Sequence, residues 1–210
     1  MAYRFLEIAS TPSVKAAQEA NGSARAWSGS QEGREFIRFT PGEMQFIAER
    51  DSFYLATVSE TGWPYVQHRG GPRGFLRPID DRTLAFADFR GNRQYISLGN
   101  LAAHDRAALF LMDYPNRRRL KIYAHIEAKD LSSEPALAEK IALPGYKAKL
   151  ERAFLVHLEA FDWNCPQHIT PRFSEAELEH ALGPVRLHIE KLEAENKALR
   201  EQRAGQGTQA

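Results

Sequence analysis

Cysteine is almost absent from this chain of 210 residues, in which Cys165 stands alone. A single cysteine excludes a disulfide framework and a cysteine-rich zinc site. The sequence also lacks a run of about 18 apolar residues, which a membrane-spanning helix requires, and its first residues lack the apolar core of a signal peptide. We therefore expect a soluble protein of the reducing cytoplasm.

An excess of charge of one sign is missing too, since 28 lysines and arginines are balanced by 27 acidic residues. A chain so balanced has no overall field that attracts nucleic acid or an anionic membrane, and we expect neither as a partner. Hydrophobic residues make up 43% and aromatic residues 10% of the sequence, which suffices for the core of one ordinary domain.

Alternating apolar and polar residues, typical of β-strands, occupy the middle of the chain. Phe53–Ser59 and Trp63–Arg69 flank the turn Glu60-Thr-Gly62 and predict a hairpin. Arg118–Asp130 alternates over a longer stretch, and Ala153–Phe161 is expected to be the last strand. The connections are too short for parallel crossovers. The sequence therefore predicts a mainly β fold, a six-stranded antiparallel barrel with peripheral helices.

Helices are expected around this barrel, which we assign to residues 35–173. A short helix over Ser13–Ala20 lies in a polar arm, residues 1–34, which is expected to attach loosely or to fold over the body or a partner subunit. Thr40-Pro-Gly-Glu43 has the pattern of a capping box with proline at the first helical position, and it opens the next helix. A further helix is predicted from Asn92 to Ala103.

The C-terminal segment, residues 174–203, has a different pattern. Its seam positions recur at alternating intervals of three and four residues: Leu182, Val185, Ile189, Leu192, Asn196 and Leu199. This heptad, flanked by charged residues and containing one asparagine, indicates a coiled coil that joins two copies of the chain. The alternative is an amphipathic helix packed on its own barrel. Residues 204–210 have the composition of a disordered tail.

The turn Phe89-Arg-Gly-Asn-Arg-Gln94 lies between an expected strand and an expected helix. Backbone N–H groups at a helix N-terminus attract anions. The Arg93 guanidinium adds two parallel donors that suit phosphate oxygens. From these residues alone, a phosphate site and a solvated basic turn both stay open.

Gln67 and Arg69 are two residues apart on an expected strand and therefore share one face. In a small barrel, polar side chains on one face suggest a lined cavity. His68 points to the opposite face, and a structural role explains this histidine nearly as well as contact with a ligand. Gly70 and Gly71 allow a flat ligand to approach the backbone closely.

Two other groups of residues carry weaker indications. Arg117-Arg-Arg-Leu-Lys121 is the densest cationic run, but no aromatic residues interleave it as a platform for RNA requires. Cys165 and His168 have a zinc-like spacing without two further ligands. We therefore expect no metal and no cysteine nucleophile.

The order of these motifs resembles the FMN-binding split barrel of pyridoxamine 5′-phosphate oxidase-like proteins. The resemblance extends from about Thr40 to Phe173. Two segments carry most of it: Pro64-Tyr-Val-Gln-His-Arg-Gly-Gly-Pro72 and Trp163-Asn-Cys-Pro-Gln-His-Ile-Thr-Pro-Arg-Phe173. It implies a split barrel, FMN as the cofactor, and a homodimer that holds the cofactor between its subunits.

The resemblance also implies roles for single residues. Asn92-Arg93-Gln94 stands where the family has a Ser-Arg-Lys turn that grips the FMN phosphate, and Ala87-Asp88 matches a pair whose backbone meets the flavin. Arg119 falls where a glutamine from the partner subunit reaches it. The predicted cofactor-binding residues are Gln67, His68, Arg69, Gly70, Ala87, Asp88, Asn92, Arg93, Gln94, Arg119, Trp163 and Gln167.

The vitamin B6 oxidases hold their substrate's phosphate with motifs that are missing from Ala136–Lys149. The resemblance therefore implies an FMN-dependent oxidoreductase that exchanges electrons with unidentified small molecules. No residue is assigned a catalytic role, since a hydride step at the flavin needs no separate acid or base. The alternatives are a protein that only stores or senses flavin, and a haem-binding or haem-degrading barrel with His68, His125 or His168 as axial ligand.

Overall fold

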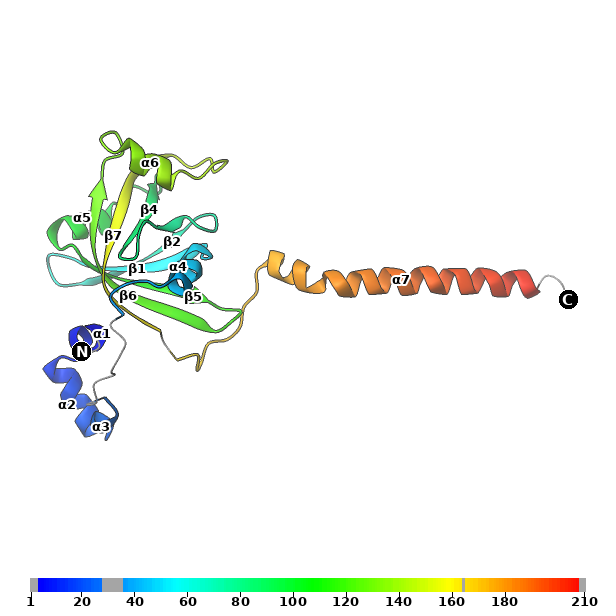
Figure 1. Cartoon of the computed structure of the whole chain (residues 1–210), viewed down its shortest axis with the longest axis horizontal. Coiled ribbons are helices and arrows are strands. Elements are labelled where there is room, and N and C mark those ends of the chain that lie inside the picture. Colours follow the sequence, from blue (N-terminus) through cyan, green and yellow to red (C-terminus); the bar gives the residue numbers. More distant parts are fainter. Residues whose placement is uncertain (1–3, 28–35, 164, 208–210) are drawn as a thin grey trace. The chain divides into compact units, whose positions relative to one another are not determined.

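A computed structural model describes residues 4–27, 36–163 and 165–207, and the strands among them form one sheet. The strands are β1 (Ser52–Val58), β2 (Pro64–Gly70), β3 (Leu76–Pro78), β4 (Thr83–Phe89), β5 (Arg106–Asp113), β6 (Arg118–Lys129) and β7 (Leu150–Trp163). Neighbouring strands are antiparallel, in the order β2-β1-β5-β6-β7-β4-β3 (Figure 1). The described residues thus form seven strands rather than the predicted six, because the three-residue β3 adds a short strand at one edge.

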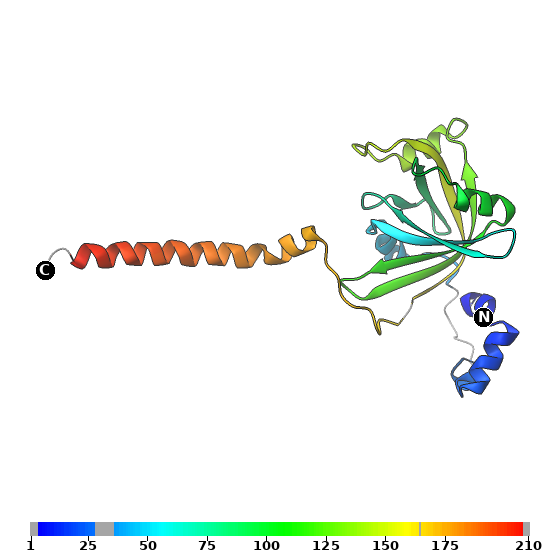
Figure 2. The same cartoon turned by 180° about the vertical axis from the view of Figure 1, so that it is seen from behind.

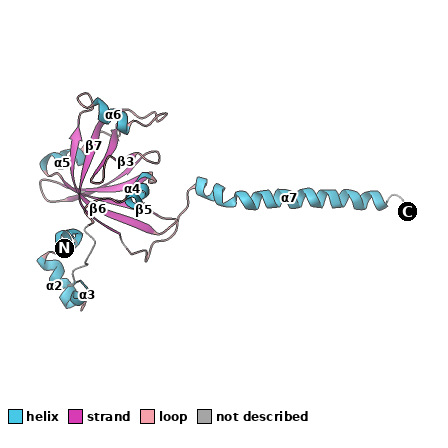
Figure 3. Cartoon of the chain, viewed as in Figure 1, coloured by secondary structure: helices cyan, strands magenta, loops and turns pink. Residues whose placement is uncertain are grey.

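The described part of the chain also forms helices, and Figure 3 distinguishes them from the strands by colour. They are α1 (Arg4–Ala9), α2 (Pro12–Ala20), α3 (Ala24–Trp27), α4 (Pro41–Ala48), α5 (Ile96–Ala103), α6 (Pro135–Ile141) and α7 (Glu175–Gly207). The chain divides into two units, Met1–Ile169 and Thr170–Ala210, so that α7 belongs to a unit of its own. None of the helices in the described ranges has the length and hydropathy needed to cross a membrane.

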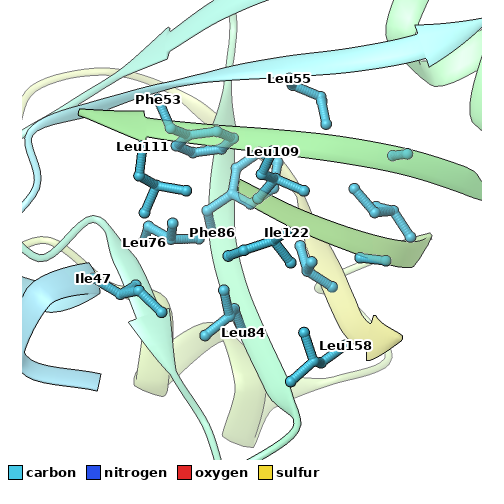
Figure 4. Close-up of a cluster of buried hydrophobic side chains, with 14 of the residues drawn as sticks. Ile47, Phe53, Leu55, Leu76, Leu84, Phe86, Leu109, Leu111, Ile122 and Leu158 are labelled. Carbon is cyan, nitrogen blue, oxygen red and sulfur yellow. The ribbon is translucent and has the colours of Figure 1, made fainter. Parts of the chain in front are cut away.

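The sheet is curled, so that strands far apart in its order share one core. Figure 2 shows the curl from behind. Phe53 and Leu55 on β1 are almost fully buried in the same cluster as Leu84 and Phe86 on β4. In Figure 4 the labelled side chains from opposite parts of the sheet, together with Ile47 of α4, point into this common interior. The fold is therefore mainly β, with a half-barrel sheet and helices around it.

Five successive residues of β4 are buried, so both faces of this strand are covered. No other strand in the described part of the chain has five successive buried residues. Leu84 and Phe86 point into the main core, and Ala85 and Ala87 pack with Ile141 of α6 in a second, smaller cluster. Since alternate residues of a strand share a face, Asp88 at the end of β4 lies on the face of Phe86. A carboxylate thus sits at the end of a buried apolar row.

Helix α4 begins with the predicted capping box. The Thr40 hydroxyl accepts a hydrogen bond from the Gly42 N–H, and the Glu43 carboxylate accepts one from the Thr40 N–H. Trp163 Nε1 donates to Glu43 Oε1 at 2.7 Å, which ties α4 to the end of β7. Burial acts to raise the pKa of Glu43, but the hydrogen bonds from Thr40 and Trp163 outweigh it and hold the pKa below its usual range.

The N-terminal arm folds over the body, which was one of the predicted alternatives. The ring of Phe5 on α1 stacks on Tyr123 of β6, with centroids 4.6 Å apart, and it is 5% exposed. Arg4 Nε donates to the carboxylate of Glu159 on β7 at 2.9 Å. Helix α2 begins one residue before the predicted Ser13. The arm's residues 1–3 and 28–34 lie outside the described residues.

Helix α7 is one continuous helix to Gly207, so it extends past the predicted end at residue 203. The expected disordered tail, residues 204–210, is therefore helical up to residue 207, and residues 208–210 lie outside the described residues. Within α7 the seam residues Leu182, Val185, Ile189, Leu192 and Leu199 are all about half exposed.

Candidate functional site

A pocket of about 250 Å³ opens beside the end of β4, between β2 and the start of α5. Six of the twelve predicted site residues line it: Gln67, Arg69, Asp88, Asn92, Arg93 and Gln94. The other lining residues are Tyr65, Phe89, Gly91, Tyr95, Ile96, Ser97, Leu98 and Glu151. The anion-binding turn and the polar face of β2, which the sequence suggested separately, therefore belong to one site.

The strand β2 presents Gln67 and Arg69 to the inside of the curled sheet. In the β1–β2 register Arg69 pairs with Phe53, which is a core residue. His68 pairs with Tyr54 on the opposite, exposed face and packs edge-on against its ring. The predicted separation of His68 from its two neighbours is thereby confirmed.

An ion-pair chain joins three strands at the base of the pocket. Arg69 Nη1 on β2 lies 2.6 Å from Asp88 Oδ1 on β4, and Arg152 Nη1 on β7 lies 3.0 Å from Asp88 Oδ2. The side chain of Asp88 is only 8% exposed, and both arginines are less than one-fifth exposed. Since β2 is at one edge of the sheet and β4 is next to the other, the pair Arg69–Asp88 links the two ends of the curl.

The Arg69 side chain has a buried nitrogen that no described residue satisfies. Its Nε is buried and has no hydrogen-bond partner among the described residues. Its Cζ lies 5.6 Å from the ring centroid of Phe154 and 5.9 Å from that of Phe86, so the group rests over two core aromatics. A buried N–H without a partner is rare and calls for an explanation, such as a ligand acceptor.

The turn before α5 has an unusual backbone. Helix α5 starts at Ile96 rather than at the predicted Asn92, because Arg93 and Tyr95 adopt left-handed conformations, with φ of 62° and 52°. Asn92 Oδ1 accepts the Gln94 N–H at 3.2 Å, which closes a local turn. The Arg93 side chain is exposed, and a hydrogen bond to Tyr95 raises its pKa above the usual value. The turn therefore offers a solvent-facing cation at the pocket mouth.

Glu151 at the start of β7 also lines the pocket, beside the turn before α5. Arg90 Nε lies 2.9 Å from Glu151 Oε1, and the Tyr95 hydroxyl donates to Oε2 at 3.1 Å. These hydrogen bonds, that from Arg90 above all, hold the pKa of Glu151 below its usual range. We count the charged side chains that line the pocket and those that form ion pairs with them. The arginines are Arg69, Arg90, Arg93 and Arg152, and the carboxylates are Asp88 and Glu151. Four cations against two anions leave an excess of two positive charges.

Acidification is expected to reduce the contribution of Glu151 to the free energy of unfolding. Because the pKa of Glu151 is lower in the folded than in the unfolded chain, its stabilising contribution is present above the unfolded pKa, about 4.3, and disappears as pH falls through the folded value. The difference in unfolding free energy between wild type and Glu151→Gln should thus be constant near neutral pH and shrink in acid. Urea unfolding at a series of pH values measures it.

Glu60→Gln provides the control for this experiment, since Glu60 is exposed in the turn between β1 and β2. A difference for Glu151→Gln that stays the same down to the lowest pH would contradict the ion pairing of Glu151.

Hydrogen bonds fix α5 on the strands that form the pocket. Ser97 Oγ donates to Gln67 Oε1 at 2.8 Å, and Ser97 is 2% exposed. One turn further on, Asn100 Nδ2 donates to Thr57 Oγ1 of β1 at 3.0 Å. The amide of Gln67 is thereby oriented, with its oxygen directed to Ser97.

The other six predicted residues do not line the pocket. Gly70 ends β2 beside the ring of His68, and Ala87 faces the small cluster behind β4. Arg119 pairs with Met112 in the β5–β6 register, and Trp163 packs against α4. Gln167 is exposed in a turn.

The glycines Gly70 and Gly71 leave room for the chain's own side chains. A Cβ at Gly71 would lie 2.9 Å from Cβ and Cγ of Phe75, and one at Gly70 would lie 3.0 Å from His68. The buried Phe75 thus explains Gly71 without a ligand, whereas a side chain at Gly70 would require a small shift of the exposed His68 ring.

The histidines proposed as haem ligands are also absent from the pocket lining. His68 lies on the outer face of β2, and His125 Nδ1 pairs with Asp105 at 2.9 Å. His168 is exposed in the turn that contains Gln167.

Sequence reasoning missed Tyr95, Ser97, Glu151 and the supporting Arg152. The last strand was expected to begin at Ala153. The strand in fact begins at Leu150. Its charged start faces Asp88, which is paired with Arg152 in the β4–β7 register. That register joins segments some sixty residues apart and leaves no local pattern.

The fold is a curled antiparallel half-barrel, and the candidate site is a cationic pocket beside the turn before α5. Residues 39–156, more than half of the chain, match the family model described as pyridoxamine 5′-phosphate oxidase. The chain therefore belongs to the pyridoxamine 5′-phosphate oxidase-like family. None of the curated proteins matches the sequence significantly.

Several solved structures are similar to this chain. HupZ of Group A Streptococcus is 14% identical, with 64% of this chain and 100% of that chain covered and a TM-score of 0.46. A Clostridium acetobutylicum protein related to general stress protein 26 is 14% identical, with coverages of 65% and 94% and a TM-score of 0.45. An FMN-binding protein from Syntrophomonas wolfei is 16% identical, with coverages of 57% and 81% and a TM-score of 0.44.

Proposed function

We propose that this chain binds FMN in the pocket beside α5 and acts as an FMN-dependent oxidoreductase on a small molecule. The observation that carries the proposal is the excess of arginines around the pocket of a member of this family, where the lining residue Arg69 has a buried Nε without a partner. FMN presents phosphate oxygens and ring carbonyls, which are acceptors. The excess of arginines over carboxylates suits its anionic phosphate.

The residues have distinct parts in this proposal. Arg93 and Asn92, at the exposed turn, would hold the phosphate, and Arg69 would donate from Nε to an acceptor of the cofactor. Asp88 fixes the Arg69 guanidinium from behind by its ion pair. When bound, FMN supplies the two-electron chemistry. Glu151 stays ionised near neutral pH and is not suited to donate a proton, so we assign no catalytic residue.

A second copy of the chain would complete the site. A pocket of about 250 Å³ is smaller than the 300 to 1,000 Å³ or so that ligand sites commonly enclose. The outer face of β1 and β2 exposes Tyr54, Val58 and Val66, and Trp63 in the adjoining turn is 76% exposed. Such a patch is suited to a subunit interface. We propose a homodimer on this face, to which Arg119 of the partner contributes.

Replacing Arg93 by alanine is expected to weaken FMN binding by about tenfold to a hundredfold, the range for losing charge-assisted hydrogen bonds. Quenching of FMN fluorescence by the purified protein measures the affinity. Arg106→Ala is the matched control, because Arg106 is exposed on β5 and does not line this pocket. A wild-type protein that neither quenches FMN fluorescence nor carries a flavin absorption band would refute the proposal.

A protein that only stores or senses flavin is the second candidate. Both pocket carboxylates are paired with arginines, which suits simple binding as well as a hydride step that needs no acid or base, so these contacts do not separate the two candidates. Anaerobic addition of NADH or NADPH to the FMN complex separates the two candidates. Bleaching of the flavin absorption and its recovery with an acceptor indicate an oxidoreductase. The exposed thiol of Cys165 supports a reducing, cytoplasmic location for either.

A further inference from the structure

Helix α7 has a regular seam of exposed apolar side chains. Assigning Leu182, Ile189 and Asn196 to heptad position a places Val185, Leu192 and Leu199 at position d. The five apolar members are between 45% and 59% exposed, and the helix continues without interruption from Glu175 to Gly207. A helix with such a stripe on one side is stabilised when a matching stripe covers it.

The positions beside the seam carry complementary charges. In a parallel pair, each g residue lies near the e residue of the next heptad on the other helix. Glu195 at g then meets the oppositely charged Arg200 of the partner, and the imidazole of His188 at g lies near the partner's Glu193 carboxylate, to which it can donate a hydrogen bond. A second copy of α7 therefore presents what the first requires on both sides of the seam.

Charge alone does not decide the orientation of the two helices. An antiparallel arrangement that places Ile189 against the partner's Leu192 also brings Arg186 near the partner's Glu193. It would, however, bury the amide of Asn196 against the partner's Val185, where no acceptor or donor meets it. In the parallel arrangement the two Asn196 amides face each other and can hydrogen-bond, which is how a buried asparagine at a selects register.

Pro184 is compatible with this arrangement. It lies within α7, where it removes one backbone hydrogen bond. In the heptad it occupies position c, on the side away from the seam, so its ring does not enter the contact between helices. The residues from Val185 onward form the uninterrupted part of the seam.

We infer that α7 joins two copies of this chain as a parallel two-stranded coiled coil, in register at Asn196. The inference rests on the seam and its flanking charges and does not depend on flavin binding. It adds a second contact between copies, separate from the outer face of β1 and β2.

Cysteine cross-linking of the full chain tests the inference. With Cys165→Ser as background, Leu199→Cys places a thiol at position d, where the two helices of a parallel coil come within disulfide reach. Ala194→Cys places it at position f, on the outside. Under mild oxidation of dilute protein, the linked dimer should form at least about tenfold faster for Leu199→Cys, because pairing raises the effective concentration of the thiols.

Equal rates for the two variants would overturn the inference. An antiparallel coil would be revealed by mixing Leu182→Cys chains with Leu199→Cys chains that carry a mass tag. Preferential linking between the two kinds of chain would then also overturn it. FMN titration of the same samples distinguishes the two proposals. Linked chains that do not bind FMN would support the coiled coil and refute only the flavin site.

Discussion

Asp88→Asn is expected to lower the free energy of unfolding by about 3 kcal/mol, because it leaves the charges of Arg69 and Arg152 without their buried counter-ion. Asparagine has nearly the same shape as aspartate, so the change removes charge without opening a cavity. Its amide oxygen can still accept from one arginine, but its NH₂ then faces donors of the other. Urea unfolding without added flavin measures the loss.

Asp81→Asn is the matched control for this experiment. Asp81 pairs with Arg38 at 2.8 Å, but the two side chains are 45% and 60% exposed, and surface pairs contribute about 1 kcal/mol or less. Equal losses for the two substitutions would show that Asp88 does not hold the curl of the sheet together. Because Asp88 also fixes Arg69, its replacement should in addition weaken FMN binding if the proposed site is correct.

Phe86→Ala is expected to cost about 3 to 5 kcal/mol of unfolding free energy, the range for deleting a core aromatic ring. Phe86 is 0% exposed on β4 and contacts two further rings, Phe154 with centroids 5.1 Å apart and Phe53 at 5.2 Å. Removing the ring would leave a cavity that the close-packed side chains on three strands cannot move enough to fill. The substitution would also remove an aromatic ring beneath the Arg69 guanidinium.

Phe173→Ala is the same substitution at an exposed position, where the side chain is 57% exposed, and it should change stability by about 0.5 kcal/mol or less. Thermal and urea unfolding of both variants provide the comparison. A loss for Phe86→Ala no larger than that for Phe173→Ala would mean that the core is not organised around β4.

Local chemistry made parts of the fold predictable. The capping box at Thr40 and Glu43 depends on four consecutive residues, and the structure has it. The opposite orientations of His68 and Arg69 follow from the period of a strand, and the β1–β2 register agrees. The turn around Arg93 was located from its composition, and it does line a pocket.

The remaining parts depend on contacts between distant segments. Nothing local to Asp88 indicates that Arg69 and Arg152 meet on it, because their meeting requires the curl of the whole sheet. The expected start of the helix at Asn92 was wrong since helix propensity does not disclose left-handed residues at Arg93 and Tyr95. Gly70 and Trp163, which the resemblance assigns to the cofactor, lie beside His68 and against α4, and their part in cofactor binding stays a prediction.

The left-handed residues of the turn before α5 have a consequence for ligand binding. An L-residue in that conformation is strained by about 1 to 2 kcal/mol, and glycine would avoid the strain. Glycine would also remove the guanidinium of Arg93 and the ring of Tyr95. The folded protein thus bears the strain of the turn whether or not a ligand is present. In the proposed site, the phosphate of FMN would meet a preorganised loop, so its binding would not have to supply the free energy of bending the backbone.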